Sequence, residues 1–148
     1  MKAFKFRLQR IRDLREAKEK SKLIEFGKEQ QKLSDEQQKL NLFQTEAELQ
    51  VMDLRTERQQ PFRVMDQSTS FRYMNRIARV IDYQNGVVRA QMNSVERARL
   101  RYLDAHRDTK VMDRLRNKRF QDWTREMLRE EGKVLDEVGT RKQDRDEL

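Results

Sequence analysis

The second half of the chain carries the clearest hydrophobic pattern. One column repeats every seven residues, at Met74, Ile81, Val88, Val95 and Tyr102. A companion column lies three residues further on, at Ile77, Gln84, Gln91, Ala98 and Ala105, followed by Thr109 and Met112. Two heptad columns on an otherwise polar surface are typical of a coiled-coil helix. The run predicts a helix from about residue 70 to about residue 139, with Ser68 or Ser70 as its N-cap.

The apolar phase shifts beyond Met112, where it continues at Phe120, Trp123, Met127, Val134 and Val138. A shift of this kind changes the supercoil locally and does not end a helix. The first half has a narrower stripe, at Phe26, Leu33, Leu40, Ala47 and Leu54, preceded by Phe4, Leu8, Ile11 and Leu14. This stripe predicts a first helix from about residue 4 to about residue 59.

The stretch from Arg58 to Phe71 interrupts the pattern and contains Pro61, the only proline. Proline lacks an N–H and disfavours helical geometry at the preceding Gln60, so the first helix is expected to end here. Neither helix can bury its own stripe, and the break between them is short. We therefore expect the helices to fold back on each other. A bend at about 60–69 would place residue i near residue 130 − i.

The predicted fold is all-α, a long antiparallel two-helix coiled coil, or helical hairpin, that forms a single domain over residues 1–148. The second helix is the longer, so residues beyond about 127 would run past the start of the first. Residues 140–148 would form a frayed tail. Gly27 and Gly86 fall inside the predicted helices, where they could permit either close approach or bending.

Composition supports this fold, because 41% of the residues are charged and 35% are hydrophobic. The net charge of +8 is distributed in blocks. Residues 1–22 carry nine basic and three acidic side chains, and residues 23–69 carry six and nine. Residues 72–119 carry thirteen basic and five acidic side chains, and residues 120–148 carry six basic and nine acidic ones. Blocks of alternating sign predict that acidic and basic segments lie side by side. A nucleic-acid binder would concentrate one sign of charge on a patch, so we do not expect a nucleic-acid partner.

Candidate chemistry is sparse. The chain has one histidine, His106, and no cysteine, so a zinc site has too few ligands. Adjacent carboxylates such as Asp136 and Glu137 diverge by about 100° on a helix and cannot act together on one bond. No phosphate-binding glycine loop or nucleophile motif is present. We expect no catalytic, metal-binding or cofactor-binding residue, no small-molecule substrate and no enzymatic activity.

Two terminal motifs resemble the FliJ family, the small components of the bacterial flagellar protein-export apparatus. The opening "FKFRLQRIRDLREAKEK" is similar to the start of that family through Phe6, Arg7, Leu8, Gln9, Leu14 and Arg15. The ending "REEGKVLDEV" is similar through Glu131, Lys133, Leu135, Asp136 and Glu137. The stretch "SFRYMNRIARVIDYQ" resembles the aromatic entry into the family's second helix. Gly132 departs from the usual polar residue, which puts helix continuity there in question.

The resemblance implies a hairpin similar to the stalk subunit of rotary ATPases, without cofactors. Its expected partners are the hexameric flagellar export ATPase, the cytoplasmic domain of the export gate and export chaperones. The protein would be cytoplasmic and would reach the inner face of the cell membrane only through these partners. The residues implied for the ATPase-binding end are Phe6, Arg7, Leu8, Arg10, Ile11, Leu135, Asp136 and Glu137. Those implied for the gate-binding half are Phe43, Phe62, Phe71, Met74 and Ile77.

Two alternatives stay open from the sequence. One is the equivalent stalk of a virulence type III secretion system, which a neighbourhood of flagellar genes would argue against. The other is a basic coiled coil that binds nucleic acid, which would show a steep dependence of DNA affinity on salt. At the bend, Phe62, Val64 and Met65 could serve loop packing or form a contact edge for the gate.

Overall fold

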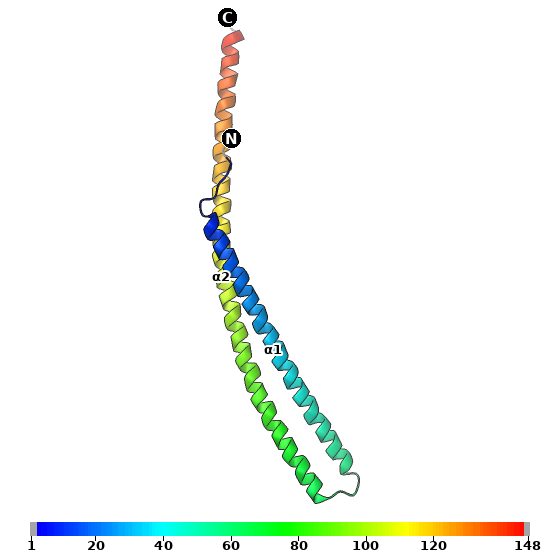
Figure 1. Ribbon diagram of the computed structural model, residues 1–148. Coiled ribbons are helices and arrows are strands. Elements are labelled where there is room, and N and C mark those ends of the chain that lie inside the picture. The colour runs from blue at the N-terminus through cyan, green and yellow to red at the C-terminus, as the bar shows by residue number, and fades with distance from the viewer. Residues whose placement is uncertain (1–2, 147–148) are drawn as a thin grey trace. The chain divides into compact units, whose positions relative to one another are not determined.

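The computed structural model describes residues 3–146, with side chains described as far as residue 137. It contains two helices, α1 (Gln9–Glu57) and α2 (Val64–Asp146), and no strand within the described residues. The chain divides into two compact units. We call Lys20–Leu103 the bend unit, and Met1–Glu19 with Asp104–Leu148 the terminal unit. In each unit α1 and α2 pack against each other, which confirms the predicted helical hairpin (Figure 1).

The seam of the bend unit is formed by the predicted heptad columns of α2. Its buried residues are Leu54, Ile77, Gln84, Val88 and Ala98. Ala98 is the most enclosed, with 1% of its surface exposed. Only one stripe of each helix is covered, so the remaining surface is charged and solvated. This is the narrow interface of a coiled coil, as the sequence predicts.

Two glutamines set the register of the bend unit. Gln84 Nε2 donates to the Glu36 carbonyl at 3.1 Å and to Glu36 Oε2 at 2.5 Å. Seven residues along, Gln91 Nε2 donates to the Glu29 carbonyl at 3.1 Å and to Glu29 Oε2 at 2.6 Å. In both pairs the residue numbers add up to 120 and not to the predicted 130. Polar seam pairs of this kind favour one register over others, because any slip leaves the amides without partners.

The register differs from the prediction because the bend is shorter and lies earlier in the sequence. The last turn of α1 is closed by hydrogen bonds from the backbone N–H groups of Arg58, Gln59 and Gln60, and Pro61 follows. α2 begins at Val64, where the N–H groups of Asp66 and Gln67 donate to the Arg63 carbonyl. The bend therefore spans about 58–63, whereas the sequence predicted about 60–69.

The predicted N-caps Ser68 and Ser70 are wrong, because both lie inside α2. Asp66 lies in the first turn of α2, where its carboxylate interacts favourably with the positive end of the helix dipole. The guanidinium of Arg58 also lies 5.7 Å from the ring centre of Phe71, which joins the two sides of the bend. These contacts allow the helix to begin one to two turns before the serines.

The seam carboxylates of the bend unit are held in their ionised form. Hydrogen bonds from Lys32 and then Gln91 lower the pKa of Glu29, and those from Lys39 and then Gln84 lower the pKa of Glu36. The acidic segment of α1 is thus bonded to its own lysines and to glutamines of α2. The sequence predicted that this acidic segment lies beside a basic segment of α2, and the direct partners of Glu29 and Glu36 on α2 are glutamines.

Acidification should weaken this seam. Because the folded pKa values are depressed, the contribution of Glu29 and Glu36 to stability is present above the unfolded pKa of about 4.3 and is lost as the pH falls through the folded values. Between neutral and acidic pH, the melting temperature should fall less for the Glu29→Gln, Glu36→Gln double variant than for the native chain. Thermal unfolding followed by circular dichroism measures this difference. A matched variant, Glu48→Gln with Glu57→Gln, changes two exposed glutamates of α1. Equal acid sensitivity in the two variants would contradict the seam assignment.

The terminal unit is joined by an ion pair and a hydrogen bond between the helices as well as by apolar contact. Arg12 Nε donates to Asp113 Oδ1 at 2.6 Å, which raises the pKa of Arg12. His106 Nδ1 lies 2.7 Å from Glu19 Oε1, and this hydrogen bond lowers the pKa of Glu19. These two pairs are again seven residues apart on each helix. Beside them α2 buries Ala105, Thr109 and Met112.

Within α1, the part of the predicted N-terminal stripe at Ile11 and Leu14 is not the face that packs. Ile11 is 43% exposed and Leu14 is 70% exposed, while Arg12, Arg15 and Glu19 lie toward α2. The prediction failed because the facing part of α2 offers Asp113, His106 and the Asp108 carbonyl, which accepts from Arg15 at 3.2 Å. In this unit, the polar groups that α2 offers, and not the apolar side chains of α1, determine which face of α1 packs against α2.

The glycines inside the helices do not serve close approach. A Cβ added at Gly27 or Gly86 would meet nothing within 4 Å, and no glycine has a positive φ among the described residues. The same holds for Gly132, through which α2 continues to Asp146. The helix therefore extends beyond the predicted end near 139 and into the predicted tail 140–148, whose last two residues lie outside the described part of the chain.

Candidate protein-docking site

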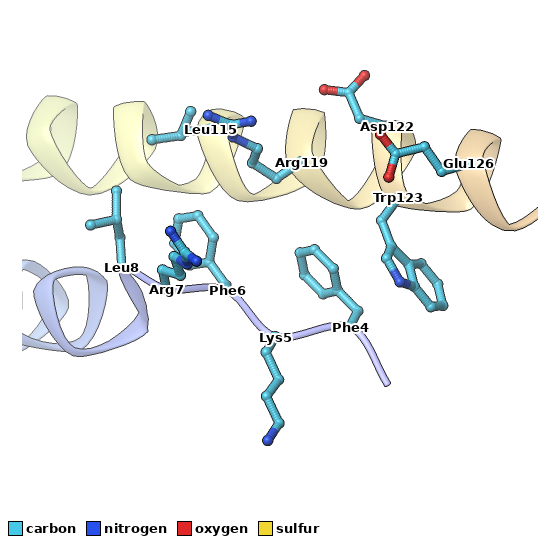
Figure 2. A pocket seen from close by; sticks show the side chains of 10 residues that line it. All are labelled: Phe4, Lys5, Phe6, Arg7, Leu8, Leu115, Arg119, Asp122, Trp123 and Glu126. Atoms are coloured by element: carbon cyan, nitrogen blue, oxygen red, sulfur yellow. The ribbon is translucent and has the colours of Figure 1, made fainter. Parts of the chain in front are cut away.

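The chain reaches α1 through a short segment without helix, residues 3–8, which ends in a turn at Arg7 and Leu8 and which we call the strap. Apolar and basic side chains alternate along it, and Figure 2 shows Phe4 and Phe6 directed toward α2 while Lys5 points away. Helix begins only at Gln9, whose N–H donates to the Phe6 carbonyl at 3.1 Å. The predicted helix start near residue 4 is therefore wrong. A period of two places Phe4 and Phe6 on one side of an extended chain, whereas a helix would separate them by about 200°.

An aromatic cluster anchors the strap on α2. The Phe4 ring lies edge-on to Phe120, with centroids 5.3 Å apart, and 5.9 Å from Trp123. Phe120 and Trp123 stack at 5.8 Å. These separations fall in the favourable range for aromatic pairs, each of which contributes about 0.5–1.5 kcal/mol beyond burial. The phase shift of the apolar pattern after Met112 thus coincides with the stretch of α2 that faces the strap instead of a helix.

A cavity of about 530 Å³ lies between the strap and α2, and we call it the notch. Its walls combine the apolar side chains of both segments with charged groups at the rim. The lining residues are Phe4, Lys5, Phe6, Arg7, Leu8, Leu115, Arg119, Asp122, Trp123 and Glu126 (Figure 2). Its volume lies in the range of cavities that hold small ligands or single side chains of a partner.

Charge is unevenly placed around the notch. Arg7 and Arg119 lie at the end near Leu8, and Asp122 and Glu126 lie at the end near Trp123 (Figure 2). Neither arginine forms an ion pair with any residue that the structure describes. The first turn of α1, which follows the strap, contains no acidic residue, so the positive end of its dipole is not compensated there. The notch is therefore an apolar floor with a basic end and an acidic end.

The structure gathers only part of the implied ATPase-binding set. Phe6, Arg7 and Leu8 line the notch, and Arg10 and Ile11 follow in the first turn of α1. Leu135, Asp136 and Glu137 lie at least nine residues beyond Glu126, about 14 Å further along α2. Leu135 is 71% exposed. The two terminal motifs thus belong to one unit and do not form one site.

The implied gate-binding residues divide into two groups in the bend unit. Phe62 and Phe71 are about half exposed. Phe43, Met74 and Ile77 lie toward the seam, and Ile77 is buried, so a direct contact from its side chain would require the helices to separate. The sequence pattern did not indicate a second, exposed apolar stripe on the outer face of α1, at Leu42, Leu49 and Met52. Its spacing of seven and three residues is typical of one face of a helix. It was overlooked because the heptad column from Phe26 to Leu54 already accounted for the apolar residues of this helix.

Several residues of the notch were not predicted as site residues, namely Phe4, Lys5, Leu115, Arg119, Asp122, Trp123 and Glu126. The alternation of apolar and basic residues from Phe4 to Leu8 could have shown the strap, because a period of two indicates an extended chain. The described residues contain no group of three or more potential metal ligands. In that same part of the chain no helix has the length and apolarity needed to cross a membrane.

Comparison with known proteins gives one result. The family model described as flagellar FliJ protein matches residues 4–147 of the chain. The match therefore covers both helices, the bend and the strap. No curated protein and no solved structure matches the chain significantly.

Proposed function

Because this chain belongs to the FliJ family of flagellar proteins, we propose that it acts as a stalk and adaptor between the hexameric export ATPase and the export gate. Family membership makes the chain a component of the flagellar export apparatus, a type III secretion system. It also favours the flagellar over the virulence apparatus. In this proposal the protein works in the cytoplasm and reaches the inner face of the membrane through its partners.

The notch is the observation that carries the ATPase-binding role. It lies in the terminal unit and is built in part by Phe6, Arg7 and Leu8, which belong to the motif that resembles the family's opening. An apolar cavity with a charged rim is the usual form of a site that accepts anchor side chains from a protein partner. The surrounding coiled coil supplies rigidity.

The bend unit supplies the surface that we assign to the export gate. Leu42, Leu49 and Met52 form an apolar stripe on α1, and Phe62 and Phe71 are exposed at or near the bend. Exposed apolar side chains in one stripe mark protein-binding surfaces more often than isolated ones do. We assign the handling of export chaperones to the same exposed surfaces, since the seam residues are covered.

Charge reversal in the strap tests the ATPase-binding role. In this proposal the ATPase surface that meets the strap is acidic. Arg7→Glu with Arg10→Glu would then place like charges against each other, and should weaken binding to the purified flagellar export ATPase at least tenfold and abolish stimulation of ATP hydrolysis. Affinity is measured by pull-down and titration, and stimulation by phosphate release. The matched control Arg79→Glu with Arg89→Glu makes the same change of net charge on exposed positions of the bend unit. The ATPase-binding role is excluded if the native chain neither binds nor stimulates the enzyme.

A further inference from the structure

We propose that the notch binds a protein segment in which a large apolar side chain lies next to a carboxylate. The apolar side chain enters between the strap and α2, and the carboxylate lies between Arg7 and Arg119. The inference rests on the proposed function in one respect, since it takes the terminal unit to be a docking end. It adds the chemistry of the segment that docks there, which the family match does not specify.

The floor of the notch calls for an apolar anchor. Phe4, Phe6, Leu115 and Trp123 line a cavity of about 530 Å³ that the aromatic contacts of the strap leave open. Phe120, whose ring contacts those of Phe4 and Trp123, is itself 49% exposed. An aromatic or large aliphatic side chain would remove this surface from water, at about 25 cal/mol per Å² of apolar area.

The basic end calls for an anion. A guanidinium presents a planar set of donors that matches a carboxylate, and both Arg7 on the strap and Arg119 on α2 line the notch (Figure 2). The uncompensated dipole of α1 adds positive potential on the same side. Both arginines are exposed in the free protein, so a bound carboxylate would gain charged hydrogen bonds without breaking existing ion pairs.

The acidic end decides between a peptide carboxylate and a nucleic acid. Asp122 and Glu126 line the notch beside Trp123. A nucleic-acid strand carries a phosphate at every step and would bring some of them against these carboxylates. A peptide can instead carry a carboxylate at one end of the notch and a cation or neutral group at the other. The placement of charge therefore favours a protein segment with an acidic residue at one side of its anchor.

Trp123 is the only tryptophan of the chain, so its fluorescence reports directly on the notch. The probe is the blocked peptide N-acetyl-Glu-Phe-Lys-amide, titrated against the full chain and compared with the same peptide carrying Gln in place of Glu. We expect a saturable change in Trp123 emission and an affinity about tenfold lower for the Gln peptide. Equal affinities, or no saturable change, would overturn the proposal.

Variants of the two arginines distinguish binding of the peptide carboxylate at the notch from nonspecific electrostatic attraction to a basic protein. Arg7→Gln with Arg119→Gln should remove the difference between the two peptides, and circular dichroism checks that the helices persist. The control Arg114→Glu with Arg116→Glu lowers the net charge further at exposed positions of α2 that do not line the notch. It should retain the preference for the Glu peptide, and loss of the preference there would contradict the assignment. Phenyl phosphate is the competing anion, and if it binds more tightly than the Glu peptide the choice of a carboxylate is wrong.

The notch assignment and the ATPase-binding role can be tested separately. The peptide titration contains no ATPase, so a peptide that binds as expected to a chain that ignores the ATPase would remove the proposed function and leave the notch assignment in place. An ATPase that binds the native chain and the Arg7→Gln, Arg119→Gln variant equally would remove the notch from that interface. It would leave the export role itself untouched.

Discussion

Replacing Ala98 with glutamate should lower the melting temperature of the chain by about 5–15 °C. Ala98 is 1% exposed and lies in the heptad column of α2 that faces α1. A glutamate there must either remove its carboxylate from water or push the helices apart, at a cost of about 2–4 kcal/mol. A hairpin with one thin seam has few other contacts that could offset such a loss, so the effect should extend beyond the site.

The measurement is thermal unfolding followed by circular dichroism at neutral pH. Ala90→Glu is the matched control, because Ala90 lies on the exposed surface of the same helix and the substitution changes charge and helix propensity equally. We expect the control to stay within about 0.5 kcal/mol of the native chain. If Ala98→Glu and Ala90→Glu melt together, the seam does not pass through Ala98 and the register described above is wrong.

The α2 column that contains Ala98 could be predicted from the sequence because its heptad repeat is unbroken. Ile77, Gln84, Ala98 and Ala105 are all buried, although one is polar and two are small. Here the position within the repeat was a better guide than the hydrophobicity of the individual residue. A repeat of 3.5 residues keeps one stripe facing the partner helix, and any side chain at those positions is covered.

The beginning of α1 could not be predicted in the same way. Ile11 and Leu14 follow helical spacing, yet they are exposed, and Arg12 and Glu19 face α2. The reason lies on the other helix, where Asp113 and His106 provide partners. A pattern along one segment contains no information about the segment opposite, and the predicted register was off by several residues. The inner face of a mixed polar seam is therefore settled by pairing and not by periodicity.

The candidate site was predicted in part. The resemblance identified Phe6, Arg7 and Leu8, and these residues do line the notch. It could not identify Arg119 and Trp123, which come from a distant part of the chain and contribute only because the strap is not helical. The assumption of a helix from residue 4 hid the alternation that places Phe4 and Phe6 on one side. The sequence motif could therefore not be connected to the notch without knowing that the backbone of the strap is not helical.

Truncating both aromatic residues of the strap should release it from α2. Phe4→Ala with Phe6→Ala removes the two ring contacts of Phe4, at 5.3 Å to Phe120 and 5.9 Å to Trp123, and the apolar wall that Phe6 supplies. The lost aromatic pairs correspond to about 1–3 kcal/mol, which shifts the equilibrium between docked and free strap by about 5- to 160-fold. Because the strap is not helical, the far-ultraviolet circular dichroism spectrum should hardly change.

The emission of Trp123 measures this release, since it is the only tryptophan in the chain. We expect a red shift of its maximum and readier quenching by acrylamide, because the indole gains contact with water. Phe62→Ala with Phe71→Ala is the matched control, since it removes two half-exposed phenylalanines from the bend unit. An emission maximum that stays in place in the strap variant would show that Phe4 and Phe6 do not cover Trp123. A red shift confined to that variant would place the strap on α2 in solution, so the notch that depends on it would exist before any partner binds.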